Sequence, residues 1–218
     1  KKISLEKKNY FKYWEENTLI VLIILNILKL NFYDFKKRIE NLKPLRGRGE
    51  KLKIFKNKKS FFLIDESYNS SPYTLKNSII NANNILKNNQ KLVLVIGDML
   101  ELGKFSEELH SSISETVKEV SPKLLFTVGT FSKIITNNVK NKIKAFHYKT
   151  YHRVYERLIE ELGDNDIVMI KGSNSINLSK ICERLKKNSF MFYHFFIPLI
   201  DNFHFLNLFN YLTFRAGG

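Results

Sequence analysis

Short apolar runs alternate along most of this chain with longer segments in which apolar residues recur every three or four positions. The short runs are typical of β-strands, and the longer segments are typical of helices with one buried face. The predicted strands are residues 51–56, 60–65, 91–96, 123–128, 143–147 and 166–171. The predicted helices are residues 73–88, 106–119, 130–139, 150–162 and 175–187. The first two strands form a hairpin through Asn57–Lys59, and the alternation that follows predicts an α/β fold with a mostly parallel sheet flanked by helices.

Two further helices are predicted before this alternating region, at residues 15–29 and 31–42. The first is apolar nearly all round, but its run over 19–28 is too short to span a bilayer, which takes about 20 residues. We therefore expect a buried helix. The second is amphipathic and ends before Pro44, as helices commonly do. The basic, glycine-containing segment 45–50 then marks the best domain boundary.

These boundaries divide the chain into three parts, residues 1–43, 44–188 and 189–218. The middle part is long enough to bury its own core. The last part contains an aromatic, apolar stretch, residues 191–218, which suits a segment at a membrane surface better than a complete membrane span. The chain begins at Lys1 rather than at a methionine and stops at Gly218 just after an aromatic run, so we expect a fragment of a longer protein. No secretory signal is visible at its start.

The formal net charge of +15 comes from 36 lysines and arginines against 21 acidic residues. Much of it is lysine beside asparagine, in strings such as KNNQK and NNVKNK, which we interpret as solvated surface. The alternative is a basic module that docks on an anionic membrane or on nucleic acid. The single cysteine, Cys182, excludes a disulfide framework and favours a reducing compartment.

Acidic residues follow two of the predicted strands at the point where each strand ends. Asp65 and Glu66 come at the end of one apolar run, and Asp98 follows another. Because α/β proteins place ligands at the carboxyl ends of their strands, we expect one polar crevice there. The ordinary alternative for each acid is a cap of the following helix. Further predicted helix caps are Ser71, Ser106, Thr130 and Ser175.

Four more residues are candidates for binding. Arg48 lies between two glycines, where a guanidinium can pair with a phosphate, although a flexible basic linker has the same composition. Glu101 has the same two interpretations as Asp98. His110 falls on a predicted helix, where a lone histidine is more often a structural hydrogen-bonding group. Lys171 ends the last strand, where it can meet an anion or simply precede a turn. The sequence contains no phosphate-binding loop, dinucleotide fingerprint or Cys/His metal spacing.

Five motifs in a fixed order resemble the carboxyl-terminal domain of the Mur ligase family. They are LRGRGE at 45–50, IDESYNSSP at 64–72, VIGDMLELG at 95–103 with ELH at 108–110, FTVG at 126–129 and VMIKGS at 168–173. Tyr68, Asn69 and the GDMLELG string are most similar to the branch of the family that adds D-alanyl-D-alanine. The resemblance implies a Rossmann-like sheet over residues 44–188, preceded by the last two helices of a truncated central ATPase domain.

The resemblance also implies an ATP-dependent ligase of peptidoglycan precursor synthesis in the bacterial cytoplasm. In that family ATP, with Mg²⁺, phosphorylates the carboxylate of UDP-MurNAc-tripeptide, and the amine of D-alanyl-D-alanine attacks the acyl phosphate. By motif position, Arg48 resembles the arginine that reaches the ATP phosphates. Asp65 resembles the acid that holds the ribose, with Tyr68 and Asn69 along the same edge. The residues that resemble the substrate-binding side are Asp98, Glu101, His110 and Lys171.

Two positions depart from the family's pattern. Glu66 stands where a second aspartate is usual, and Asn174 stands where the Lys-Gly-Ser motif usually continues with arginine. The phosphate-binding loop, the Mg²⁺ ligands and the uridine-binding domain would lie before Lys1, so we expect this chain alone to be inactive. Folate-polyglutamate-type and cyanophycin-type ligases share the domain, but they would carry histidine at the position of Tyr68.

The end of the chain, residues 206–216, resembles the amino terminus of MraY, the phospho-MurNAc-pentapeptide transferase. This second resemblance implies a fusion, or two joined reading frames, that would place the ligase at the inner face of the cytoplasmic membrane. The alternative is a translated artefact of gene order. No nucleic acid partner is implied by either resemblance.

Overall fold

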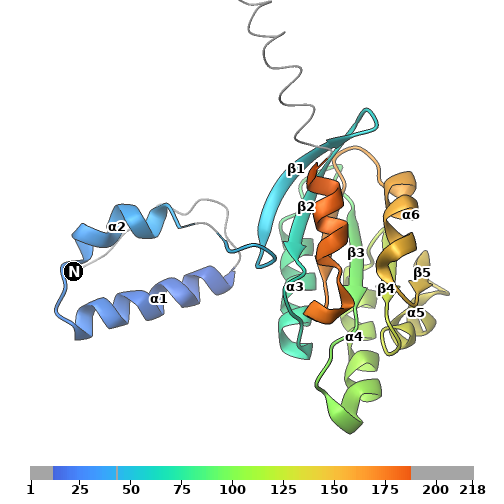
Figure 1. Ribbon diagram of the computed structural model, residues 1–218, viewed down its shortest axis with the longest axis horizontal. Helices are drawn as coiled ribbons and strands as arrows, with labels where there is room; N and C mark the ends of the chain where they lie inside the picture. Colours follow the sequence, from blue (N-terminus) through green and yellow to red (C-terminus); the bar gives the residue numbers. More distant parts are fainter. Residues whose placement is uncertain (1–11, 43, 188–218) are drawn as a thin grey trace, which may run out of the picture.

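A computed structural model of the chain describes residues 12–42 and 44–187, which form an α/β domain and two helices beside it (Figure 1). The domain is built on a sheet of six strands in the order β1-β2-β6-β3-β4-β5. All neighbouring strands are parallel except β1 and β2, which are antiparallel. The strands are β1 (Glu50–Lys56), β2 (Lys59–Glu66), β3 (Leu92–Gly97), β4 (Leu124–Val128), β5 (Ala145–Tyr148) and β6 (Ile167–Lys171). The predicted α/β fold with a mostly parallel sheet is confirmed.

The hairpin between β1 and β2 turns where the sequence predicts it. Lys56 pairs with Lys59 across the turn, and the two residues between them have positive φ angles, 49° at Asn57 and 62° at Lys58. Two consecutive residues in this conformation make the two-residue turn whose twist matches that of the paired strands. On its other side β2 pairs with β6 in parallel, so the carboxyl ends of these two strands lie side by side.

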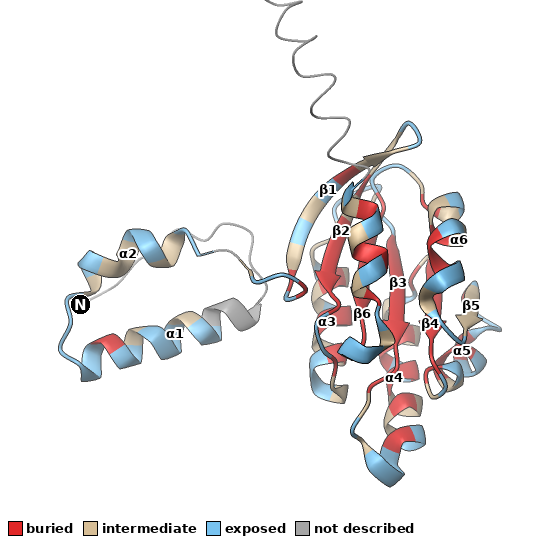
Figure 2. Ribbon diagram, viewed as in Figure 1, coloured by how far each residue is buried: buried red, intermediate tan, exposed pale blue. Residues whose placement is uncertain are grey.

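Helices cover both faces of the sheet and enclose two apolar cores (Figure 2). One face is covered by α3 (Pro72–Asn84), α4 (Ser106–Val120) and α5 (Lys133–Val139). The other is covered by α6 (Val154–Glu161) and by a helix that runs from residue 179 to 187, where the described residues end. Short 3-10 turns are η1 (Gly103–Phe105), η2 (Tyr151–Arg153) and η3 (Asn174–Ile176). Because both faces are covered, a central strand such as β3 is buried along its whole length.

The predicted helix caps are partly right. Ser71 caps α3 and forms a capping box with Thr74. Ser106 is the first residue of α4, but its side chain bonds to the carbonyl of Gly103 and does not cap. The expectation for Thr130 is wrong, because α5 begins at Lys133 and a distant carboxylate accepts the backbone N–H groups before it. The expectation for Ser175 is also wrong, because η3 occupies that position and the long helix begins at residue 179.

The two helices before the domain are α1 (Lys12–Ile27) and α2 (Phe32–Glu40), which lie against each other. The prediction of a helix through the first apolar run is confirmed, but the prediction of its burial is wrong. Leu25 is 8% exposed, whereas Leu19 and Ile27 are 57% and 70% exposed. Among the described elements α1 packs mainly on α2, so one short helix leaves most of its apolar surface uncovered.

None of the helices within residues 12–42 and 44–187 has the length and apolar content that crossing a membrane requires. The aromatic stretch 191–218 and its resemblance to MraY lie outside the described residues.

Candidate functional site

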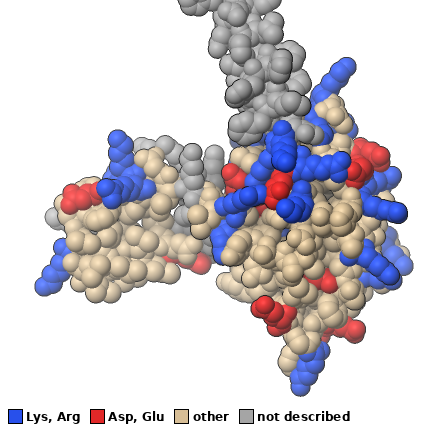
Figure 3. All heavy atoms as spheres, in the orientation of Figure 1, with Lys and Arg blue, Asp and Glu red and all other residues tan. Residues whose placement is uncertain are grey.

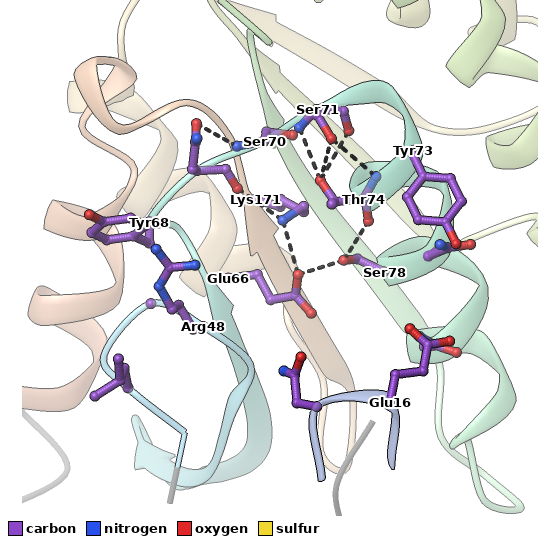
Figure 4. A pocket seen from close by; sticks show the side chains of 16 residues that line it. Glu16, Arg48, Glu66, Tyr68, Ser70, Ser71, Tyr73, Thr74, Ser78 and Lys171 are labelled. Carbon is purple, nitrogen blue, oxygen red and sulfur yellow. Dashed lines mark hydrogen bonds and ion pairs between the residues drawn. The ribbon is translucent and has the colours of Figure 1, made fainter. Parts of the chain in front are cut away.

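A cavity of about 580 Å³ opens where β2 and β6 end (Figure 4). Its walls come from the linker before β1, the loop between β2 and α3, the first turns of α3 and the beginning of α1. Lys171, the last residue of β6, also lines it. Its position at the carboxyl edge of the sheet agrees with the expectation for the acidic end of β2. The expectation that one crevice also holds the acidic end of β3 is wrong, because Asp98 does not line this cavity.

Glu66 is the central charged group of this cavity. Its carboxylate oxygen Oε2 accepts a hydrogen bond of 2.5 Å from the hydroxyl of Ser78 on α3 and lies 3.1 Å from Nζ of Lys171. The second oxygen, Oε1, is buried and has no hydrogen-bond partner among the described residues. A buried oxygen left without a donor costs roughly 1–3 kcal/mol, so a ligand that supplies a donor would be stabilised here.

Arg48 and Tyr68 form the opposite wall. The guanidinium of Arg48 lies 4.0 Å from the centre of the Tyr68 ring, a distance at which a cation binds an aromatic face. The linker is fixed to the loop, because the backbone N–H of Tyr68 donates to the carbonyl of Gly47. Gly47 has a φ of +72°, and a Cβ there would lie 3.0 Å from Tyr68 atoms, so both conformation and space require glycine.

The loop between these walls leads into α3. Asn69 lines the cavity, its side-chain oxygen accepts the backbone N–H of Ser70, and its carbonyl accepts a hydrogen bond of 2.9 Å from Lys171. The hydroxyl of Ser70 is buried on the cavity wall without a hydrogen-bond partner among the described residues. The cavity therefore combines the cations Arg48 and Lys171, the carboxylates Glu16 and Glu66, and polar atoms without a partner among the described residues. Such a set suits a ligand with both phosphate and hydroxyl groups.

Asp65, the neighbour of Glu66, does not line this cavity. Strand geometry sends adjacent side chains to opposite faces, and Asp65 meets the helix at 179–187 instead. Its Oδ2 accepts a hydrogen bond of 2.7 Å from Lys186, and its Oδ1 accepts one of 2.6 Å from the hydroxyl of Ser67. Lys186 is also 2.7 Å from Glu50, so it joins β1, β2 and the last helix.

These contacts change the protonation of Asp65. Burial alone would raise the pKa of Asp65, but the hydrogen bonds from Lys186 and Ser67 outweigh burial and lower it. Burial likewise opposes the charge of Lys186, yet Asp65 and Glu50 raise the pKa of its ammonium group. The folded state therefore favours the ionised pair.

We expect acid to weaken the fold partly through Asp65. Since its folded pKa lies below the unfolded value of about 3.9, its contribution is present above that pH and is lost as the pH falls through the folded pKa. Asp65→Asn should lower the free energy of unfolding at pH 7 and flatten its decline below about pH 4. Urea unfolding at a series of pH values measures both effects. Parallel curves for the two proteins would show that Asp65 titrates alike in the folded and unfolded states.

Asp98 and His110 do not line the cavity. Both are buried, and both form hydrogen bonds with backbone groups. Asp98 is 3% exposed, and its carboxylate accepts the backbone N–H groups of Thr130, Phe131 and Ser132 before α5. His110 is fully buried: its Nε2 accepts the N–H of Met99, and its Nδ1 donates to the carbonyl of Ser106. Burial lowers the pKa of His110 against the opposing effects of that carbonyl and of Asp98. The alternative interpretation of both residues, as structural groups, has the better support.

The structure thus brings together Arg48, Tyr68, Asn69 and Lys171 from the candidate residues. Glu101 lies exposed in the loop before η1 with a φ of 65°, and like Asp98 and His110 it stays only a prediction as a substrate-binding residue.

Sequence reasoning named Glu66 as an acid at a strand end but not as the acid that lines the cavity, and it missed Ser70 and Ser78. A usable signal existed for Ser78, because it is the one polar position on the buried stripe of α3 that also holds Leu75, Ile79 and Ala82.

The described residues contain no group of three or more His, Cys, Asp or Glu side chains that could hold a metal ion. In the cavity, the buried carboxylate of Glu66 is already paired with the ammonium group of Lys171, which disfavours a Mg²⁺ ion beside it.

Three comparisons place this geometry among known proteins. Residues 48–174 match the protein-family model described as "Mur ligase, glutamate ligase domain". The chain is similar to the UDP-N-acetylmuramoyl-tripeptide–D-alanyl-D-alanine ligase of Rickettsia prowazekii, with 25% identity over 79% of this chain and 37% of the relative. The ligase of the same name from Buchnera aphidicola subsp. Acyrthosiphon pisum is 32% identical over 58% of this chain and 27% of the relative.

Solved structures show the same fold. MurF from Acinetobacter baumannii superimposes with a TM-score of 0.63 and 21% identity, over 73% of this chain and 35% of that chain. MurF ligase from Thermotoga maritima in complex with ADP has a TM-score of 0.59 and 22% identity, over 77% of this chain and 36% of that chain. The chain spans about a third of the length of the curated relatives it matches.

Proposed function

Because this chain belongs to the Mur ligase family, we propose that it forms the carboxyl-terminal part of MurF, the ligase that joins D-alanyl-D-alanine to UDP-MurNAc-tripeptide with hydrolysis of ATP. The observation that carries the proposal is the convergence of Arg48 and Glu66 on one cavity at the carboxyl edge of the sheet. The relatives' names and the family supply the reaction, and the cavity supplies a place where this domain would meet the nucleotide.

Arg48 is the group that we assign to the nucleotide phosphates. It follows Gly47 on a short linker, and it lines the cavity. Stacking on Tyr68 restricts its rotation, so less entropy is lost when it binds an anion. A guanidinium fixed in this way can pair with two phosphate oxygens at once.

Glu66, rather than Asp65, is the acid that we assign to the sugar hydroxyls. The resemblance alone points to Asp65, but both oxygens of Asp65 accept hydrogen bonds from Ser67 and Lys186 on the other face of the sheet. Glu66 lines the cavity and keeps an oxygen without a donor. Tyr68 and Asn69 would lie along the same nucleotide, as their position on the cavity wall indicates.

In the proposed enzyme ATP supplies the phosphoryl group that activates the tripeptide carboxylate. The described residues would bind and orient the nucleotide, which brings its terminal phosphate to the carboxylate as in an intramolecular reaction. We assign no Mg²⁺ ligand to them, because they contain no suitable cluster of side chains. Phosphoryl transfer itself would depend on parts of the relatives that this chain does not span.

The proposed substrates imply a bacterial cytoplasmic enzyme, and contact with the membrane through residues 191–218 is a further proposal that rests on their aromatic composition.

The alternative function, a basic binding module, gains no support from the charges that the structure describes. Lysines and arginines over β1 and the last helix are interspersed with carboxylates (Figure 3). Ion pairs there include Lys180–Glu183, Arg184–Glu156 and Lys186–Glu50.

A hybrid enzyme would test the proposed function. Residues 45–187 would replace the aligned segment of the Bacillus subtilis ligase, a 26% identical relative. The hybrid should release phosphate from ATP only when both UDP-MurNAc-tripeptide and D-alanyl-D-alanine are present. Arg48→Ala in this hybrid should lower that rate at least about tenfold, because the phosphates lose a charged partner.

Arg46→Ala is the matched control for this experiment. Arg46 lies on the same linker, but its guanidinium pairs with Glu183 at 2.7 Å and its side chain is 69% exposed. We expect less than a twofold change in that variant. Equal rates for the Arg48 and Arg46 variants would remove Arg48 from the site, and a hybrid without dipeptide-dependent turnover would contradict the proposed function.

A further inference from the structure

We infer that Lys171 and Ser78 are positioning residues, which hold the Glu66 carboxylate by one oxygen and leave the other oxygen for a hydroxyl of the nucleotide sugar. This inference rests on the proposed nucleotide site and goes one step further, because neither residue needs to touch the ligand. It also changes the role expected for Lys171, which the sequence marks as an anion-binding group.

Lys171 is directed at the protein rather than at a ligand. Its Nζ donates to the carbonyl of Asn69 at 2.9 Å and lies 3.1 Å from Oε2 of Glu66. The side chain of Lys171 is 7% exposed, so little of its ammonium group is open to a ligand anion. A lysine with these partners offsets the cost of burying the carboxylate and fixes the loop at Asn69 beside it.

Ser78 holds the same oxygen from the helix side. Its hydroxyl lies 2.5 Å from Oε2 of Glu66 and 2.8 Å from the carbonyl of Thr74 in the preceding turn. Ser78 is 5% exposed and lies on the buried stripe of α3 between Leu75 and Ile79, which limits its movement. Figure 4 shows Glu66 between Lys171 on one side and Ser78 on the other.

Lys171 and Ser78 both contact Oε2 of Glu66 and neither contacts Oε1, which is the basis for the proposed positioning role. Oε1 lies in the buried wall of the cavity without a donor among the described residues. Glutamate has one more rotatable bond than the aspartate usual at this position, so its free carboxylate would sample more orientations. Two anchors on one oxygen remove that freedom and aim the other oxygen. A sugar hydroxyl is a neutral donor that Oε1 can accept from without a competing charge.

A comparison of two nucleotides measures how much the proposed hydrogen bond between Glu66 and the sugar contributes to binding. ADP and 2′,3′-dideoxy-ADP differ only in the hydroxyls that Glu66 would accept, and calorimetric titration of each into the full chain gives their ratio of affinities. The wild-type chain should prefer ADP by at least about tenfold, as expected for a hydrogen bond to a charged group. Ser78→Ala should reduce this preference to about threefold or less, while the affinity for the dideoxy nucleotide stays within about twofold.

Two further variants separate positioning from folding. Ser78→Thr keeps a hydroxyl at the same place and should retain the wild-type preference. Ser112→Ala removes a hydroxyl from α4 that bonds only to the carbonyl of Leu109 among the described contacts, and it should leave the preference unchanged. An unchanged preference in Ser78→Ala, with ADP still bound, overturns the inference and leaves the nucleotide site standing. A wild-type chain that binds neither nucleotide contradicts the proposed site itself.

Discussion

Lys171→Met should lower the free energy of unfolding by about 3–5 kcal/mol, which is the range for removing one partner of a buried ion pair. Lys171 and Glu66 lie 3.1 Å apart, and each side chain is 7% exposed. Methionine fills a similar volume, so the cost comes from leaving the Glu66 carboxylate buried without its cation. Asn69 would also lose the donor that fixes its carbonyl. Equilibrium unfolding in urea measures the change directly.

Lys118→Met is the matched control for this prediction. Lys118 lies 2.8 Å from Glu115, a shorter ion pair than Lys171–Glu66, but Glu115 is 78% exposed. Exposed pairs contribute at most about 1 kcal/mol, so we expect a small effect there. Adding Glu66→Gln to Lys171→Met should recover at least half of the lost stability, because no buried charge is then left unpaired. Equal losses in the two lysine variants would show that burial does not matter at this site.

The alternation of strands and helices could be predicted because it depends on local patterns of apolar residues. The hairpin and the capping box of α3 follow from equally local chemistry at Asn57, Lys58 and Ser71. The burial of α1 could not be predicted in the same way. A helix-period run of apolar residues predicts a helix, but it does not say which element covers the helix.

Within the candidate site, the sequence likewise does not say whether Asp65 or Glu66 lines the cavity. Period-two geometry predicts that the two acids lie on opposite faces of β2. Leu63 and Asp65 share the face covered by the 179–187 helix, whereas Ile64 and Glu66 share the face of α3. The sequence does not say which face holds the cavity, because that depends on how helices distant in the chain pack. For Asp98 and His110 the missing information was likewise the identity of their backbone partners.

Gly129→Ala should be the second severely destabilising change, with a loss of more than about 3 kcal/mol in the free energy of unfolding. Gly129 follows β4 with a φ of +128°, a conformation that residues with a side chain rarely adopt. A Cβ there would lie 2.2 Å from Cγ of Asp98 and 2.3 Å from its Oδ1, so the carboxylate would have to move.

Displacement of Asp98 would also destabilise the start of α5. The carboxylate accepts three backbone N–H groups, at Thr130, Phe131 and Ser132, with distances of 2.7, 3.2 and 2.7 Å. Within the part of the chain that the structure describes, Ser132 at the start of α5 makes no side-chain capping bond, so the N–H groups there depend on Asp98. Hydrogen bonds to a charged acceptor contribute about 1.5–3 kcal/mol each, and losing even two of them exceeds the cost of backbone strain alone.

Gly103→Ala separates these two costs. Gly103 also has a positive φ, +54°, but a Cβ there would meet nothing within 4 Å. It should therefore show only the strain of the left-handed conformation, about 1 kcal/mol. Thermal and urea unfolding of both variants give the comparison, and amide hydrogen exchange at residues 130–139 reports whether α5 loosens first. If Gly129→Ala cost no more than Gly103→Ala, the contact with Asp98 would not be what requires glycine after β4. A larger loss, with faster exchange confined at first to α5, would assign Asp98 to the architecture of the domain rather than to substrate binding.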